Sequence, residues 1–435
     1  MNEIPKTTTA ILRITRNINM GKIIFLILFC SFFVFKSKSQ SEENIEPKFK
    51  YTPYGYVCYE TYIDTYESRM TRNGEMYFYP LKPNFDSISG IDLNENLQLN
   101  MLSLQSRAGI RITGPDYFNA KSSALIEADF FGTAEDTKYL LRIRHACFSL
   151  KWEQLSLLMG QYWHALHTPE CFPKTIGFGA APGYNPLNRS PQIRVDYKIN
   201  NLINFAGIAA VHGYHKSVGP EKSQSNSGVP DIQLQSHFFF DKILLGIGGG
   251  YFQLQPRTGE NIKQIESRIH AFDAIFFGVA NYEKFSVRIK SVVGQNLSYC
   301  LLTGGFGQTY ESQMNNNDFK YTSLINNTNW FDCDYSITKY FSLGLFSGIS
   351  FNLGATDKIT KDNNFYDRDS NIAYIIRIAP RIVYTNNKLV FALEYSHDKA
   401  AYAEEFDEYY RPKTNNLKEG VNHRILFSAK YHFAN

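Results

Sequence analysis

The chain has 435 residues, of which 43% are hydrophobic and 20% charged, and its formal net charge is +4. Six basic residues but only one acidic residue fall within the first 40 positions, so the remainder holds 39 basic and 40 acidic residues. This balance gives no indication of nucleic-acid binding. Aromatic residues make up 15% of the chain. A polar chain rich in aromatics is typical of membrane β-barrels, in which only alternate residues face lipid.

The first segment in chain order is an apolar run at 23–35, which Lys22 precedes and small residues follow. The run is shorter than the roughly 18 apolar residues that a membrane-spanning helix needs, and its flanks are typical of a cleaved secretory signal peptide. We therefore predict a signal peptide over residues 1–39, or from Met20 if the start is misassigned. Residues 40–49 are predicted to form a short periplasmic segment, and export of this kind fits the outer membrane of a Gram-negative bacterium.

Period-two alternation of apolar and polar residues is the main structural signal after the leader. In the segment 285–290, apolar residues take the odd positions, and Ser286, Arg288 and Lys290 take the even ones. A β-strand places two such sets on opposite faces. About sixteen segments have strand character, an even number as expected for a bacterial single-chain barrel. The predicted strands span 50–67, 95–113, 120–131, 138–150, 154–163, 189–198, 203–212, 232–240, 243–252, 268–280, 284–294, 318–335, 340–353, 371–384, 388–397 and 421–433.

Connection lengths distinguish a barrel from a soluble β-sandwich, whose strands also alternate. Every second predicted connection is short and carries turn residues, as at 200–201 and 241–242. The connections between them are mostly long and polar, with 132–137 as the exception. Short periplasmic turns that alternate with long external loops are characteristic of outer-membrane barrels. We therefore predict an all-β fold, a transmembrane antiparallel barrel over residues 50–435 that is surrounded by outer-membrane lipid.

Charged residues are frequent among the positions that alternate with the apolar, lipid-facing sets, and these positions are expected to line the lumen. Arginines in a narrow zone draw anionic solutes through a pore, whereas pairing with acids across strands only stiffens the wall. Both interpretations remain open, and the basic surplus slightly favours anions. The predicted pore-lining residues are Arg107, Arg111, Glu127, Asp129, Arg142, Arg144, Arg194, Arg288 and Lys290.

The connection 164–188 is the third external loop, counted from an N-terminus on the periplasmic side. Such a loop often folds into the lumen of porins of this size, so we predict that it forms the constriction, with charge from His164 and Lys174. An external flap without a gating role is the alternative. His164 and His167 have helical metal-ligand spacing, but they lack a third ligand nearby, so no metal is predicted. The cysteines after the leader are scattered, and no cofactor is implied.

Four strings resemble the DcaP-type porin family in their order and spacing. They are IEADFFG at 126–132, LRIRHA at 141–146, MGQYW at 159–163 and RSPQIR at 189–194. The resemblance is specific over roughly residues 100–200, whereas the later strands share only general features with the family. It implies a homotrimer of sixteen-stranded barrels with a positively charged eyelet that passes small anions such as dicarboxylates. It points to Arg107, Arg142, Arg144 and Arg194 as eyelet residues, and we add Gln161 and Gln192 from the same strings to the pore lining.

Two features depart from that family. Some members carry a helical extension before the barrel, for which 40–49 leaves no room, and this chain continues to Asn435 beyond its last aromatic residue, Phe433. The sequence as a whole predicts a porin without enzymatic activity, which lets small hydrophilic, anionic solutes diffuse down their gradient. The first alternative is a non-conducting barrel that serves as an adhesin or scaffold. The second is an outer-membrane hydrolase, which requires a Ser/His or Asp/His pair converging near the rim.

Overall fold

The computed structural model describes residues 48–260, 263–314, 320–359 and 365–433, so the predicted leader and most of the segment 40–49 lie outside it. Within these residues, sixteen strands form the wall of one closed antiparallel barrel. The wall strands are β1 (Lys50–Asp64), β4 (Gln98–Leu102) with β5 (Arg107–Thr113), β6 (Lys121–Asp129), β7 (Arg142–Lys151), β8 (Leu155–Trp163), β9 (Arg189–Lys198), β10 (Ile203–Ala210), β11 (Asp231–Phe239), β12 (Ile243–Leu254), β15 (Ile269–Asn281), β16 (Phe285–Gln295), β18 (Tyr321–Ser336), β19 (Phe341–Ala355), β21 (Ile372–Asn386), β22 (Leu389–Tyr402) and β23 (Lys418–Phe433).

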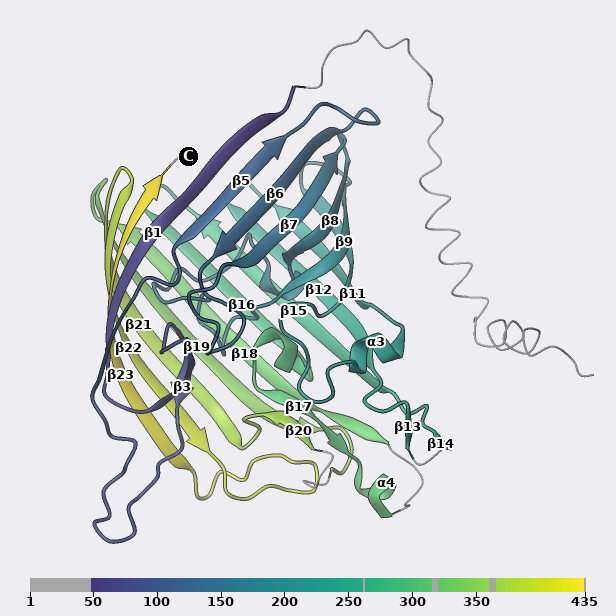
Figure 1. Cartoon of the computed structure of the whole chain (residues 1–435), viewed down its shortest axis with the longest axis vertical. Coiled ribbons are helices and arrows are strands. Elements are labelled where there is room, and N and C mark those ends of the chain that lie inside the picture. Colours follow the sequence, from purple (N-terminus) through teal and green to yellow (C-terminus); the bar gives the residue numbers. More distant parts are fainter. Residues whose placement is uncertain (1–47, 261–262, 315–319, 360–364, 434–435) are drawn as a thin grey trace, which may run out of the picture. The chain divides into compact units, whose positions relative to one another are not determined.

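The barrel closes where its first and last strands meet. β1 pairs with β23, from Gly55 opposite Phe433 to Asp64 opposite Arg424. Figure 1 shows this seam, with purple β1 beside yellow β23. The other edge of β1 pairs with β4 and β5, which follow one another along it and count as one wall strand. Closure gives each terminal strand a partner on both sides, which removes the exposed edges that would otherwise promote aggregation.

Side chains of the wall strands alternate between the lumen and the outer surface. On β23, Arg424 and Ser428 are buried, whereas Ile425 and Phe427 are exposed. An apolar outer face of this kind matches the hydrocarbon core of a bilayer. The predicted transmembrane barrel is therefore confirmed, and its fold is that of an outer-membrane protein. No helix in the described part of the chain is both long and apolar enough to cross a membrane.

The predicted strands agree with the wall strands, and their ends differ by at most five residues. Several short elements in the loops were not predicted, because they carry no periodic pattern of their own. They are β2 (Ser68–Thr71), β3 (Met76–Pro80), η1 (Ala165–His167), α3 (Ser223–Ser227), β13 (Gly259–Glu260), β14 (Lys263–Gln264), η2 (Leu297–Cys300), β17 (Gly304–Gln308), α4 (Tyr310–Met314) and β20 (Tyr366–Arg368).

Several external loops fold inward in part, and we name three of them loop 1 (65–97), loop 3 (164–188) and loop 6 (296–314). In loop 1, β2 and β3 form a hairpin, and every residue of β3 is buried. The hairpin is attached to the wall by Tyr402, which donates a hydrogen bond of 2.7 Å to the carbonyl of Pro80.

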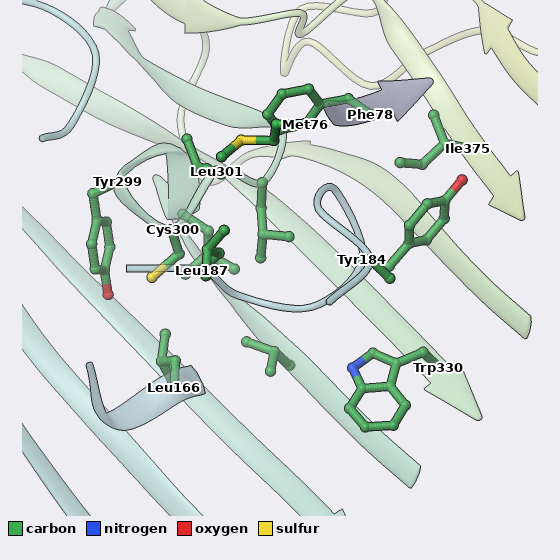
Figure 2. Packing of buried hydrophobic residues seen from close by; sticks show 14 of the residues in the cluster. Met76, Phe78, Leu166, Tyr184, Leu187, Tyr299, Cys300, Leu301, Trp330 and Ile375 are labelled. Atoms are coloured by element: carbon green, nitrogen blue, oxygen red, sulfur yellow. The ribbon is translucent and has the colours of Figure 1, made fainter. Parts of the chain in front are cut away.

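The inward loops build an apolar core inside the barrel. Figure 2 shows its members, which are Met76 and Phe78 of loop 1, Leu166, Tyr184 and Leu187 of loop 3, Tyr299, Cys300 and Leu301 of loop 6, and Trp330 and Ile375 of the wall. Burying one such side chain contributes about 1.5–3 kcal/mol. The lumen is therefore partly filled by packed apolar side chains, which the alternation of the strands alone could not indicate because these residues belong to loops.

Candidate functional site

Charged residues predicted on the first strands form one buried cluster on the inner wall. Arg142 Nε lies 2.6 Å from Asp129 Oδ1, and Arg144 Nε lies 2.6 Å from Glu127 Oε1. Arg144 Nη1 also lies 2.8 Å from Asp129 Oδ2, and Arg107 Nε lies 3.7 Å from Glu127 Oε1. The cluster arises from register, because Asp129 pairs with Arg107 on one side and with Arg142 on the other. We call these five residues the arginine cluster.

Arg189, the first residue of β9, adds a cation to this cluster without adding an acid. It is 2% exposed, and its guanidinium stacks 3.9 Å from the centre of the Trp163 ring. Arg189 Nε has no hydrogen-bond partner among the described residues. Its charge interacts with those of Arg144, Arg142 and Arg107. With Arg189, the cluster contains four guanidinium groups and two carboxylates, so it has a positive surplus.

Two residues of the loop 211–230, Tyr214 and His215, interact with these arginines. Tyr214 Oη accepts a hydrogen bond from Arg142 Nη1. Burial lowers the pKa of the His215 imidazole well below its ordinary value, and the positive charges of Arg368 and Arg189 lower it further. The contributions of these arginines to the shift have the sign expected beside a group of positive charges.

Arg111 and Arg194 were predicted to line the same zone but make separate contacts. Arg111 is exposed, and its guanidinium lies 3.9 Å from the centre of the Tyr54 ring. Arg194 donates two hydrogen bonds, of 2.9 and 2.8 Å, to Asp196 on the same strand. The charge of Arg194 is therefore largely neutralised locally.

Gln161 and Gln192, from the strings that resemble the DcaP-type family, each bind the backbone of a neighbouring strand. Gln161 Nε2 donates a hydrogen bond of 3.1 Å to the carbonyl of Arg144. Gln192 Nε2 donates one of 2.8 Å to the carbonyl of Trp163. Both side chains thus hold the backbone that carries the arginine cluster.

Arg288, on the opposite half of the sequence, belongs to a balanced group of charges. Arg288 and Arg381 both bind Asp332, at 2.6 and 2.8 Å, and both also bind Asp334. We call these four residues the paired cluster. Lys174 of loop 3 lies 3.5 Å from Asp334 and is exposed. Two guanidinium groups face two carboxylates here, so only Lys174 adds net charge.

Arg377 and Arg424 also lie on the inner wall, and the predicted pore lining omitted Arg377 and Arg381. Arg377 lies 2.5 Å from Asp398, and Arg424 lies 2.8 Å from Asp64. The alternation that identified Arg288 would also have found Arg377 and Arg381, because both alternate with apolar residues within 371–384. No alternation marks Arg189, because it begins a strand directly after a long loop.

Loop 3 lies against the inner wall, where two predicted residues hold it. Lys290 Nζ donates hydrogen bonds to the carbonyl of His167, at 2.5 Å, and to Asn185 Oδ1, at 3.0 Å. At the start of the loop, His164 Nε2 lies 3.0 Å from Asp231 Oδ2. This position differs from that of an external flap, although the role of the loop in limiting passage stays a prediction.

Cavities show where the lumen is open. A cavity of about 320 Å³ on the side of the short turns is lined by Lys174, Ser286 and Arg381. A second, smaller cavity of about 30 Å³ lies between loop 1 and loop 3, beside Glu75 and Phe178. The space between these two loops is small, and a constriction formed by loop 3 stays a prediction.

Comparison with known proteins supports the fold. No family model matches the chain, and no curated protein matches its sequence. Among solved structures, the outer membrane channel DcaP of Acinetobacter baumannii matches with a TM-score of 0.66 and 15% identity, covering 91% of this chain and 100% of that one. An anion-selective porin from Comamonas acidovorans matches with a TM-score of 0.55 and 8% identity, covering 89% and 100%. The trimer form of the outer membrane protein OmpT of Vibrio cholerae matches with a TM-score of 0.51 and 10% identity, covering 89% and 99%. The chain thus has the fold of sixteen-stranded outer-membrane channels, and the predicted resemblance to DcaP is confirmed at the level of structure.

Proposed function

We propose that this chain is an outer-membrane porin that prefers small anions. The observation that carries the proposal is the positive surplus that the arginine cluster forms together with Arg189. Among the described residues, Arg189 has no carboxylate of its own, and Arg107 shares one. Unpaired charge is costly away from bulk water, so an anion that enters this zone offsets part of that cost. Rings of positive charge in a narrow pore favour anions over cations.

Dicarboxylates are the solute class that fits the cluster best. Its surplus of two positive charges matches a dianion, and a planar guanidinium can bind a carboxylate through two parallel hydrogen bonds. The resemblance to the DcaP-type porins supports the same class. It also supports assembly as a homotrimer, which the mass of the purified protein in detergent would test.

The reversal potential across a potassium chloride gradient tests the anion preference. In planar bilayers, the wild type is expected to prefer chloride, and the double variant Arg107→Gln with Arg189→Gln is expected to lose most of this preference. Arg411→Gln provides a matched control, because Arg411 lies on an external loop with its side chain 59% exposed. A cation preference of the wild type, or an unchanged potential in the double variant, would refute the proposal.

A non-conducting barrel is the second candidate, and the apolar core inside the lumen favours it. Apolar side chains packed between the inward loops reduce the space for a hydrated solute, and the cavity beside Glu75 and Phe178 measures only about 30 Å³. If the folded protein in planar bilayers shows no conductance under any voltage, the barrel serves as a scaffold or adhesin.

The hydrolase alternative requires a Ser/His or Asp/His pair that is open near the rim. Among the described residues, Asp231 lies 3.0 Å from both His164 and His212, but all three side chains are buried. This group does not support the hydrolase, so these residues need another explanation.

A further inference from the structure

Three metal-ligating side chains from different parts of the chain meet at the base of loop 3. His164 begins the loop, His212 follows β10, and Asp231 begins β11. The Nε2 atoms of both imidazoles lie 3.0 Å from the same oxygen, Asp231 Oδ2, and the three ligand atoms lie within 4.8 Å of one another. Ligands bound to one zinc ion at about 2.0–2.1 Å, in tetrahedral directions, lie roughly 3.3 Å apart.

A hydrogen-bonded amide orients the carboxylate of this group. Gln233 Nε2 donates hydrogen bonds of 2.9 Å both to Asp231 Oδ1 and to Asp273 Oδ2. Asp231 Oδ2 is thereby left to face the two imidazoles. Bonds of this kind, from a neighbouring group to the second oxygen of a ligating carboxylate, are a regular feature of metal sites.

The surroundings of the group favour a cation. Asp273 Oδ1 and Gln233 Oε1 are buried acceptors without a hydrogen-bond partner in the described part of the chain. Asp231 and Asp273 bring two carboxylates into one buried region, and one divalent cation balances both charges. Tyr299 stacks on His212 with ring centroids 3.8 Å apart, which shields the group from water. A shielded set of imidazole and carboxylate ligands suits Zn²⁺ among the common divalent cations.

A purely hydrogen-bonded triad is the competing use of the same side chains. In that arrangement both Nε2 atoms donate to Asp231, and Leu166 N, 3.3 Å from His164 Nδ1, supports the required tautomer. Cys300 Sγ, 3.9 Å from the same Nδ1, is compatible with either tautomer, including the one in which Nδ1 carries the proton and Nε2 is free to bind metal. The triad leaves Asp273 Oδ1 and Gln233 Oε1 without a partner, whereas a bound cation balances the charge of the Asp273 carboxylate and attracts the dipole of the Gln233 carbonyl.

We propose that His164, His212 and Asp231 bind a Zn²⁺ ion that fastens loop 3 to the barrel wall. Local spacing could not indicate this site, because its three residues lie far apart along the chain, and no metal was predicted for His164 with His167. His167 instead stacks on Trp163 and faces the carbonyl of Pro186. Since the three ligands are buried, the ion enters while the barrel folds or when loop 3 moves.

Metal content of the folded protein tests the site. The full chain is folded into detergent with Zn²⁺ or with a chelator, desalted and analysed by elemental mass spectrometry. The wild type folded with Zn²⁺ is expected to retain stoichiometric zinc, and His212→Gln and Asp231→Asn are expected to lose it. His237→Gln is the matched control, because His237 is buried on the same strand as Asp231 but contacts Gln235. Heat-modifiable migration on gels confirms that each variant has folded.

X-ray absorption of the zinc-loaded wild type gives a second readout, independent of any variant. The proposal expects a first shell of nitrogen and oxygen atoms with the multiple-scattering signal of two imidazoles. Wild type that retains no zinc, or a zinc shell without imidazoles, would show that the three residues form only a hydrogen-bonded triad. Zinc content that His212→Gln and His237→Gln lower equally would also overturn the proposal. None of these outcomes bears on ion selectivity, so the two proposals fail separately.

Discussion

The arginine cluster and the paired cluster lie on the same inner wall but differ in how their charges are balanced. In the paired cluster, Arg288 and Arg381 share Asp332 and Asp334, so each guanidinium has a carboxylate within 2.8 Å. In the arginine cluster, Glu127 and Asp129 serve the other arginines, and Arg189 stacks on an aromatic ring instead. An arginine that faces the lumen is therefore expected to affect ion selectivity only if its charge is not balanced by a neighbouring carboxylate.

This difference separates two roles of charge in one barrel. Balanced groups hold neighbouring strands together, since breaking a buried pair leaves an uncompensated charge. Groups with a surplus shape the potential that a passing ion meets. Substitutions in the two clusters are expected to affect different measurements, namely stability in the first case and selectivity in the second.

The largest effect is expected from Asp332→Asn in the paired cluster. The substitution leaves Arg288 and Arg381 with one shared carboxylate, and removal of one partner from a buried ion pair costs about 3–5 kcal/mol. Urea unfolding in lipid vesicles measures this loss. Asp116→Asn is the control, because Asp116 and Lys121 form an exposed pair with side chains 58% and 82% exposed. Equal stability of the two variants would contradict a structural role for the paired cluster.

Lys290→Met is expected to loosen loop 3. The substitution removes the donor from the carbonyl of His167 and from Asn185, and unsatisfied buried acceptors cost roughly 1–3 kcal/mol each. Single-channel recordings should show larger fluctuations of the open current than in the wild type. Lys358→Met, which changes an exposed lysine paired with Glu408, should leave the recordings unchanged. Recordings of Lys290→Met identical to wild type would argue against loop 3 as the constriction.

Because Glu75 is buried in the hairpin of loop 1, we predict that docking of this hairpin depends on pH. Burial raises the pKa of the Glu75 carboxyl well above its ordinary value, and the nearby Glu60 raises it further. The docked hairpin thus favours the protonated form. Docking is strongest below the ordinary pKa of glutamate, about 4.3, and weakens as pH rises towards the raised value. Protease cleavage within loop 1 should accordingly increase with pH.

Glu75→Gln removes the ionising group and should make this cleavage nearly independent of pH. The exposed Glu95 of the same loop offers a control, and Glu95→Gln should keep the dependence of the wild type. If cleavage of Glu75→Gln still rises with pH as in the wild type, another group controls the docking of the hairpin.

The smallest effect is expected from Arg111→Gln. Arg111 is exposed and stacks on Tyr54, and charges exposed to solvent are screened over a Debye length of about 8 Å at physiological salt. The reversal potential should therefore move less than in Arg189→Gln alone. A shift as large as that of Arg189→Gln would show that the selective zone extends beyond the arginine cluster.

The wall could be predicted from sequence because strands obey local rules. Alternation fixes which face a residue occupies, and short turns fix which strands are neighbours, so Asp129 could be placed between Arg107 and Arg142. The same rule applied to 371–384 would have found Arg377 and Arg381.

Contacts made by loops could not be predicted in this way. His164, His212 and Asp231 are brought together by loop conformations without a period, and so is the apolar core of loops 1, 3 and 6. The sequence analysis considered His164 only together with His167, its neighbour along the chain, and predicted no metal there for lack of a third ligand. Contacts with His212 and Asp231, which lie far along the chain, leave no trace in local spacing.

The apolar core also sets the order of events during assembly. Met76 and Leu301 belong to loops far apart along the chain, and each side chain is buried only by partners from the other loops and the wall. Neither side chain can be buried in this core until β1 has paired with β23, because the sheet encloses no interior before that step. The loops inside the barrel therefore pack last, and they stay exposed to water until the barrel has closed.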